Sequence, residues 1–310
     1  MKQTTGIVES VSWKGHLKTL RIKPGRRILP VPLSACVSKG DMVKIEEECA
    51  WTICKNGISQ FLTPYSFEEK IKLGGIELKV VVKEITEEGE YIAYQSLSKF
   101  HYRSQVIHGR TARLIMRSFH PAYPKVIGYI ELATPFYMNK ARSLLLDAPF
   151  GIDNVLWRRW DMPTLRKHIH AIVRIARIVV CPEFRGVGIG QKLIRHATEF
   201  AKNRWQVAGY LPYFVEISAD MLKYVPFAER AGMTFVGETE GNLSRVAKDM
   251  EYLISRFATN KTGLVQFEAT CGICDQQIAR MTNAIAVMQR ENLTKEHLVS
   301  RLRALSHEGV

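Results

Sequence analysis

The sequence predicts an α+β protein in which a mixed β-sheet is flanked by helices, preceded by a small β-barrel-like domain and followed by a helical tail. Three observations predict this. Short β-like runs alternate with glycine-bearing turns over about the first 95 residues, an apolar run leads into three closely spaced glycines near residue 186, and leucines recur at helical spacing near residue 300. With 310 residues the chain is long enough for several domains. We therefore expect domains at residues 1–95, 96–240 and 241–310.

Turn signals such as Lys14-Gly15 and Gly74-Gly75 divide the first domain into short strands of alternating or β-branched residues. This spacing is typical of a small barrel. The predicted strands are Gly6–Trp13, Leu17–Ile22, Asp41–Glu46, Trp51–Asn56 and Ile76–Ile85. Basic and aromatic residues such as Trp13, Lys14 and His16 are interleaved there. This mixture is typical of a nucleic-acid-binding surface. A purely structural barrel is the alternative.

The middle domain mixes predicted strands and helices. We expect a hairpin from Thr111–Arg117 and Val126–Leu132, a central strand over Ile172–Cys181, and a buried strand over Phe214–Ser218. A short helix then ends at Gly232. An insertion of about residues 135–166 separates the hairpin from the central strand. His168 and His170 alternate, so we expect them on one face of the strand that enters the core.

The glycine cluster follows the central strand directly. That strand ends at Pro182, and Gly186, Gly188 and Gly190 precede a helix whose apolar residues recur at helical spacing. Backbone N–H groups converge at such a helix N-terminus, and the helix dipole favours an anion there. The spacing fits neither a P-loop, which requires a Gly-Lys-Ser/Thr ending, nor the Gly-x-Gly-x-x-Gly dinucleotide fingerprint. It predicts a pyrophosphate-bearing cofactor, with a merely tight strand–helix turn as the alternative.

Positive charge is concentrated just before the glycine cluster. Residues 99–177 hold fourteen Lys and Arg against four Asp and Glu, so they carry +10 of the total net charge of +14. A block of this charge indicates an anionic partner, most often a nucleic acid, although a solvated basic face is the alternative. The cations we select as nucleic-acid contacts are Arg103, Arg110, Arg113, Arg158, Arg159, Arg166 and Lys167. Arg117 is a further candidate for contacting phosphates.

Three stretches together resemble the GNAT acyltransferase superfamily. They are Phe100-His-Tyr-Arg-Ser104, the run from Arg174 to Gly190 that contains Arg185-Gly-Val-Gly-Ile-Gly190, and the run from Asp220 to Met233. Within the superfamily they are similar to the acetyltransferase-like domain linked to prokaryotic ABC-type ATPases. More loosely, they resemble the Mom DNA-modification proteins of phages. The resemblance covers about residues 98–238.

The resemblance implies a GNAT-type sheet that binds acetyl-CoA or another acyl-CoA. Cofactor binding would fall on Ile178, Val179, Val180, Arg185, Gly186, Val187, Gly188, Ile189, Gly190 and Gln191. In this fold the strand before the loop separates from its neighbour, so that backbone N–H groups from Ile178 to Cys181 would polarise the thioester carbonyl. The family's histidine–tyrosine pair would correspond to His101 and Tyr102. Ala228 occupies the position of the usual general-acid tyrosine, and Tyr224, one helical turn earlier, is the candidate replacement.

Acyl transfer to an amine also requires a general base. The candidates near the expected cleft are His170, Glu216 and Asp220. Glu216 lies in a buried-looking strand, which would raise its pKa. The alternative for each of these residues is an ordinary core or surface side chain with its hydrogen bonds made and no part in catalysis.

The leading hypothesis is therefore an acyl-CoA-dependent transferase that modifies a nucleic-acid base in DNA or RNA. Alternatives are a GNAT enzyme acting on a protein, an aminoacyl-tRNA or a small amine, and a catalytically degenerate module that binds nucleic acid or a partner. No apolar run is long enough for a membrane span, and the N-terminus lacks the apolar stretch of a signal peptide, so we expect a cytoplasmic protein. We expect no metal site, because Cys271-Gly-Ile-Cys274 is only half of a zinc motif. The oligomeric state stays open.

Overall fold

The structure is a computed structural model that describes residues 3–100, 107, 109–152, 155–219, 222 and 225–237. All of these fall in one compact unit, Met1–Gly237. The predicted helical tail and the Cys271–Cys274 pair lie outside the described residues. No helix in the described part of the chain is long and apolar enough to cross a membrane.

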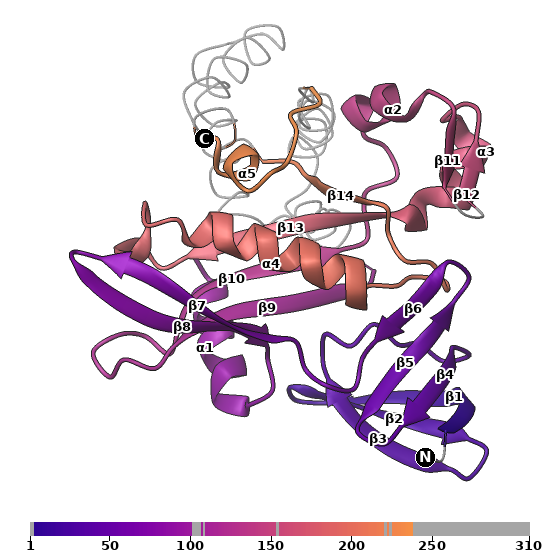
Figure 1. Cartoon of the computed structure of the whole chain (residues 1–310), viewed down its shortest axis with the longest axis horizontal. Coiled ribbons are helices and arrows are strands. Elements are labelled where there is room, and N and C mark those ends of the chain that lie inside the picture. The colour runs from indigo at the N-terminus through magenta and orange to yellow at the C-terminus, as the bar shows by residue number, and fades with distance from the viewer. Residues whose placement is uncertain are drawn as a thin grey trace, which may run out of the picture. The chain divides into compact units, whose positions relative to one another are not determined.

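Six antiparallel strands form the first sheet, in the order β3-β2-β1-β4-β5-β6 (Figure 1). They are β1 (Gln3–Lys14), β2 (Leu17–Lys23), β3 (Arg27–Pro32), β4 (Met42–Glu46), β5 (Cys49–Cys54) and β6 (Gly57–Gln60). Alternate residues such as Leu20, Val43 and Ala50 are fully buried and form one apolar cluster. Because β3 and β6 end the order, closure into a barrel remains a prediction.

A second six-stranded sheet has the order β14-β13-β10-β9-β8-β7. Its strands are β7 (Ser66–Leu73), β8 (Ile76–Glu84), β9 (Thr111–Ser118), β10 (Val126–Ala133), β13 (Ile172–Val180) and β14 (Phe214–Ile217). The β13–β14 pair is parallel, and the other pairs are antiparallel. The predicted hairpin and the strands on both sides of the glycine cluster are confirmed.

The hairpin β7–β8 joins the second sheet, because β8 pairs with β9. The predicted strand Ile76–Ile85 was assigned to the first domain, and that part of the assignment is wrong. Leu78, Val80 and Val82 pack in the core of the second sheet rather than in that of the first. An alternating strand looks the same whichever sheet it joins, so the local pattern could not decide between them.

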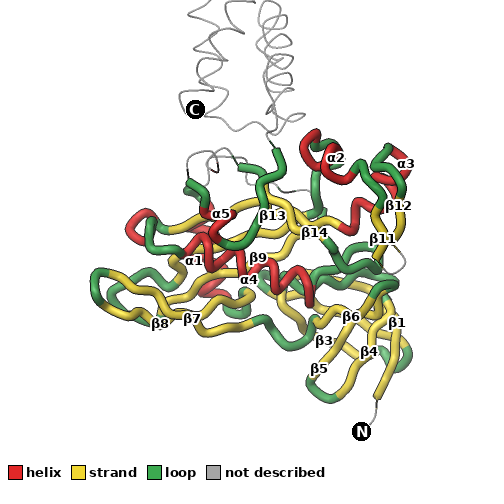
Figure 2. The backbone as a smooth tube through the Cα atoms, turned by 45° about the horizontal axis from the view of Figure 1, so that its top comes forward, coloured by secondary structure: helices red, strands yellow, loops and turns green. Residues whose placement is uncertain are grey.

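Two helices cover opposite faces of the second sheet (Figures 1 and 2). Helix α4 (Ile189–Arg204) approaches β10 at Gly128, where an added Cβ would lie 3.1 Å from Ile189 and 3.3 Å from Leu193. Helix α1 (Glu88–Ser98) places Tyr94 edge-on against Tyr129, with ring centroids 5.0 Å apart. Gly128 and Tyr129 are neighbours on β10 and point to opposite faces. We refer to these as the α4 face and the α1 face.

Buried hydrogen bonds join the two sheets. The Gln206 side chain is fully buried and donates to the Cys36 carbonyl (2.7 Å) and to Asp41 (2.6 Å). Ser34 exchanges hydrogen bonds with the backbone of Arg113 (3.0 and 2.8 Å). These buried polar groups are satisfied only when the sheets are together, so the first sheet is a fixed part of the unit.

The insertion between β10 and β13 has a core of its own. It contains α2 (Lys140–Leu146), β11 (Phe150–Ile152), β12 (Val155–Trp157), α3 (Met162–His168) and a 3-10 turn (Ile169–Ala171). Trp157 and Trp160 are buried in its apolar cluster. The prediction that His168 and His170 share a strand face is wrong: His168 ends α3 and His170 lies in the 3-10 turn.

Candidate functional site

Among the described residues, one half of β13 has no neighbouring strand on its outer edge. The ladder with β14 runs from Ile172–Phe214 to Ile175–Ile217 and stops there, whereas β13 continues to Val180. In the part of the chain that the structure describes, residues 177–180 pair only with β10, and Ala176 has no ladder partner. We call residues 176–180 the free stretch of β13.

A β-bulge begins the free stretch. Glu131 pairs with Arg177 and Leu132 with Ile175, so Ala176 is an extra residue without a partner on β10. Beyond it, the Cys181 N–H donates to the Ile127 carbonyl (3.0 Å). Alternation along the strand then directs the N–H groups of Ile178 and Val180 away from β10, toward the free edge. This is the arrangement expected for donors that polarise a bound carbonyl.

The glycine cluster forms the turn from β13 into α4. Gly186 and Gly188 have φ of +83° and +84°, and an added Cβ at either would meet nothing within 4 Å. Their role is therefore to supply the left-handed backbone and leave open space above it. Gly188 is the N-cap of α4 without a side-chain cap, and the first hydrogen bond into the helix is Lys192 N–H to the Gly188 carbonyl (3.1 Å). The N–H groups of Ile189, Gly190 and Gln191 have no acceptor among the described residues.

Two of the predicted cofactor-binding side chains are already engaged. The Arg185 guanidinium is exposed and its Nε–H donates weakly to the Val180 carbonyl (3.4 Å), at the free edge. The Gln191 amide donates to the Arg230 carbonyl at the end of α5 (Phe227–Arg230). Gln191 thus ties α4 to α5, and only its backbone remains available for an anion.

Glu216 lies beside the free stretch. It pairs with Arg174 in the ladder, which is about 7 Å along the strand from Ala176 and about 13 Å from Ile178. The Arg142 guanidinium donates to both of its carboxylate oxygens (2.9 and 3.1 Å). Burial raises the pKa of the Glu216 carboxyl above its ordinary value, against the opposing charges of Arg142 and Arg174. The predicted rise is confirmed.

His170 is at the wrong end of β13 for the same role. It precedes Ile172, and Ile178 lies six residues further along the strand, which is about 20 Å. Burial lowers the pKa of His170, with Lys55 adding to the effect. His170 therefore lies farther from the free stretch than Glu216 does, and its place next to the cleft stays a prediction.

Five predicted site residues lie outside the described part of the chain: His101, Tyr102, Arg103, Asp220 and Tyr224. The short helix that follows them is confirmed, and Phe227 packs near Gly190. Ala228 is buried in the core, so this position offers no acid.

Several arginines of the basic block are held inside the protein. Arg113 donates through Nε to Tyr94 (2.9 Å) and to Glu131 (2.8 Å), and Arg110 donates to the Ser38 hydroxyl. The prediction of phosphate contacts is wrong for Arg113, because its guanidinium neutralises a buried carboxylate, and Arg110 is likewise committed to the joint between the sheets.

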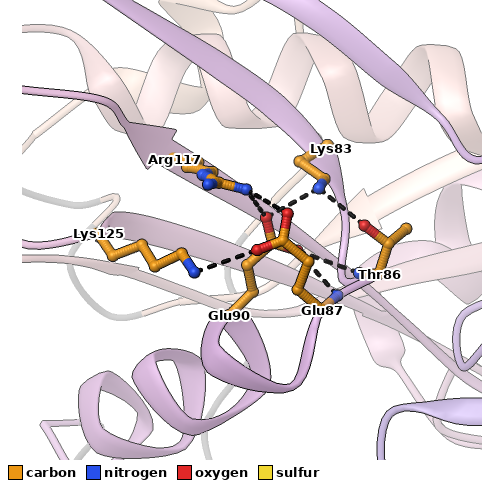
Figure 3. Close-up of polar contacts among 6 residues, drawn as sticks. All are labelled: Lys83, Thr86, Glu87, Glu90, Arg117 and Lys125. Carbon is orange, nitrogen blue, oxygen red and sulfur yellow. Dashed lines mark hydrogen bonds and ion pairs between the residues drawn. The ribbon is translucent and has the colours of Figure 1, made fainter.

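Arg117 also pairs with carboxylates of the protein, in a cluster at the start of α1 (Figure 3). It donates to Glu87 (2.7 Å) and to Glu90 (2.6 Å), and Lys125 and Lys83 pair with the same two carboxylates. The hydrogen bonds from Arg117 and Lys125 hold the pKa of Glu87 at about 2. The cluster fixes the start of α1 to β8 and β9, which explains Arg117 without a phosphate ligand.

The other basic candidates are exposed on the insertion. Arg158 and Arg159 follow β12, and Arg166 and Lys167 lie in the last turn of α3. We call these four residues the insertion patch. Charge counting could not separate them from Arg113 or Arg117, because the difference lies in which arginines face carboxylates.

The sequence analysis did not identify one residue that contacts the candidate base, Arg142, and one buried structural carboxylate, Glu131. Arg142 reaches Glu216 from 74 residues away, and Glu131 is fully buried among Tyr94, Arg113 and Arg177. A glutamate inside an otherwise apolar strand, Val126–Ala133, was the available signal for Glu131. No signal in the sequence singled out Arg142.

Comparison with known proteins agrees with the prediction that the glycine cluster belongs to a GNAT-type domain. Residues 124–233 match the acetyltransferase (GNAT) family. The match spans β10, the insertion, β13, α4, β14 and α5, so it contains the free stretch, the glycine turn and Glu216. No curated protein matches the chain. The family match supports a GNAT-type acetyltransferase domain and acyl transfer as its general chemistry.

The residues present fit an acyl-CoA. The unpartnered N–H groups at the start of α4 and the open space over Gly186 and Gly188 suit the pyrophosphate. The Ile178 and Val180 N–H groups suit the thioester carbonyl. A bound acyl-CoA would supply an activated acyl group, and these residues would contribute binding, carbonyl polarisation and a nearby carboxylate.

Proposed function

We propose that this protein is an acyl-CoA-dependent N-acyltransferase, with acetyl-CoA as the expected donor, that modifies a base of DNA or RNA. The observation that carries the acyl-transfer part is the bulged free stretch of β13 beside the glycine turn. It combines an anion site with backbone donors for a carbonyl in one continuous segment.

The insertion patch supports a nucleic-acid acceptor. Its four cations are exposed, and among the described residues no ion pair neutralises them. They belong to the block that carries +10. Cations that are not committed to internal carboxylates are available for phosphates, which supply most of the affinity of proteins for nucleic acids.

Glu216 is the proposed general base. The exocyclic amine of a base is neutral and loses a proton when its nitrogen bonds to the acyl carbon. The Glu216 carboxylate takes that proton, the carbon–sulfur bond breaks, and the sulfur leaves as a thiolate. The thiolate takes a proton from water and Glu216 returns its proton to water, so atoms and charges balance. A buried carboxylate with a raised pKa is a stronger base than an ordinary one.

Mass spectrometry of nucleosides tests the proposal. DNA and RNA from cells that express the protein are digested and compared with those from cells that express Gly188→Glu. We expect a new mass on one nucleoside that is absent from the control. If no new mass appears although purified protein binds acetyl-CoA, the nucleobase acceptor is wrong, and a protein amine, an aminoacyl-tRNA or a small amine becomes the acceptor to test. If acetyl-CoA does not bind either, the domain is a binding module without this activity.

A further inference from the structure

One guanidinium links the insertion to the candidate base. Arg142 lies in α2 and its side chain is 5% exposed, whereas that of Glu216 is 19% exposed. Its Nη1 group donates to both Glu216 oxygens, and its Nη2 group donates to the Phe136 and Tyr137 carbonyls (both 2.6 Å). Arg142 thus uses four hydrogen bonds to hold β14 and the start of the insertion in one arrangement.

The same segment of the insertion closes over the neighbouring arginine. The Phe136 ring lies 3.9 Å from the Arg174 guanidinium, and Arg174 is the residue that pairs with Glu216 in the ladder. The start of α2 is in turn fixed by its N-cap, because Asn139 accepts a hydrogen bond from the Arg142 N–H (3.0 Å). Residues 136–142 therefore form a wall around the Glu216 carboxylate on the α1 face.

We propose that Arg142 is a positioning residue, by which the insertion holds the Glu216 carboxylate beside the free stretch of β13 and orients it toward the acceptor. This inference rests on the proposed function, in which Glu216 takes the proton from the acceptor nitrogen. It assigns the insertion a part in the reaction site, in addition to the contacts of its exposed patch with the acceptor.

The electrostatics of the cluster agree with this role. The charged groups of the described residues that face Glu216 are Arg142 from α2 and Arg174 from β13. Burial raises the pKa of Glu216 and the two arginines lower it, so Arg142 limits the rise and keeps the carboxylate ionised over more of the pH range. The Arg142 guanidinium donates through one nitrogen to both Glu216 oxygens and through the other to two backbone carbonyls, which also fixes the direction in which the carboxylate points.

The first experiment measures the protonation of Glu216 directly. Full-length protein labelled with ¹³C at glutamate carboxyl groups is titrated by NMR, and the Glu216 signal is assigned by its loss in Glu216→Gln. In Arg142→Gln the midpoint of Glu216 should rise by about 1 to 3 pH units, because a neighbouring cation is removed. An unchanged midpoint would overturn the inference, whether or not the enzyme is active.

The second experiment follows acyl transfer to an oligonucleotide against pH. Because the base must be ionised, the acidic limb of kcat/KM should move to higher pH in Arg142→Gln, and kcat should fall by roughly 10- to 100-fold with an unchanged KM for acetyl-CoA. Arg142→Lys keeps the positive charge but cannot make all four hydrogen bonds of the guanidinium, so the acidic limb should stay in place while kcat falls in part. If Arg142→Gln does not fold, this fall of kcat at an unchanged acidic limb is the test.

Arg117→Gln is the matched control, since it breaks a comparable arginine–glutamate cluster away from the site. It should lower stability and leave the acidic limb in place. Equal shifts in both variants would mean that Arg142 acts only on stability, which contradicts the inference. A wild-type protein that binds acetyl-CoA but acylates no oligonucleotide would instead contradict the proposed function, while the NMR titration still decides the role of Arg142.

Discussion

Two glutamates on the α1 face both pair with arginine and have different surroundings. Glu131 lies in the middle of the sheet, is fully buried, and accepts hydrogen bonds from Tyr94, Arg113 and Arg177. Glu216 lies on the edge strand β14 and is held by Arg142, with part of its side chain still exposed. One carboxylate is saturated with donors, and the other keeps contact with solvent.

This difference assigns the two residues different tasks. A fully buried carboxylate must be paired on both oxygens, because an uncompensated buried charge is strongly destabilising. Glu131 therefore contributes to stability by joining α1, β9, β10 and β13, and it has no room for a substrate. Under the proposed function, Glu216 exchanges a proton with a molecule at the sheet edge, because part of its side chain stays exposed.

Glu216→Gln should have the largest effect on activity. The amide keeps the shape but cannot take a proton, so kcat should fall by about 10² to 10⁴-fold, the usual contribution of a general base. Acetyl-CoA binding and the free energy of unfolding should change little. The measurements are steady-state kinetics and denaturant unfolding. Full activity in Glu216→Gln would contradict the proposal that Glu216 is the general base.

Glu131→Gln should show the opposite pattern. It leaves the half-buried Arg113 and the buried Arg177 without their charge partner, which costs on the order of 3 to 5 kcal/mol. Urea unfolding measures this loss as a lower midpoint. A variant as stable as the wild type would show that the central cluster does not hold the sheet together.

Glu84 provides a third buried glutamate for the comparison, with fewer donors. It accepts from the Tyr65 N–H (2.8 Å) and lies 3.6 Å from Arg204, and burial raises its pKa to about 7. As pH rises above its ordinary value of about 4.5, the unfolded chain ionises while the folded protein does not, so stability falls until about pH 7. The fall should amount to at most about 3 kcal/mol.

In Glu84→Gln this part of the pH dependence should disappear. Urea unfolding between pH 4.5 and 7 measures it, and Glu87→Gln is the control, because the pKa of Glu87 lies at about 2, outside this window. An identical pH dependence in wild type and Glu84→Gln would contradict the assignment.

The insertion patch should give the smallest effect. Arg158 and Arg159 are exposed, in contrast to Arg113, so replacing both by Gln should leave stability unchanged. The slope of log K against log salt for oligonucleotide binding should fall by about one for each lost phosphate contact. Fluorescence anisotropy at several salt concentrations measures it. An unchanged slope would show that the patch is only a solvated face.

Local patterns predicted the parts of the fold that depend on neighbouring residues. The strand, the glycine turn and the start of α4 follow from apolar periodicity and from backbone needs at Gly186 and Gly188. The sheet that β7 and β8 join depends on contacts with β9, which alternation does not encode. The bulge at Ala176 and the reach of Arg142 to Glu216 depend on register and on three-dimensional packing, so no spacing in the sequence indicated them.

The central claim is that acyl-CoA binds at the start of α4 with its thioester along the free stretch of β13. Isothermal titration calorimetry of acetyl-CoA against wild type and Gly188→Glu tests it most directly. A carboxylate at the helix N-terminus opposes the pyrophosphate, and a side chain at φ +84° adds about 1 to 2 kcal/mol of strain. The account predicts one site per chain in the wild type and no measurable binding in the variant. Equal affinities, or no binding by either protein, would contradict it.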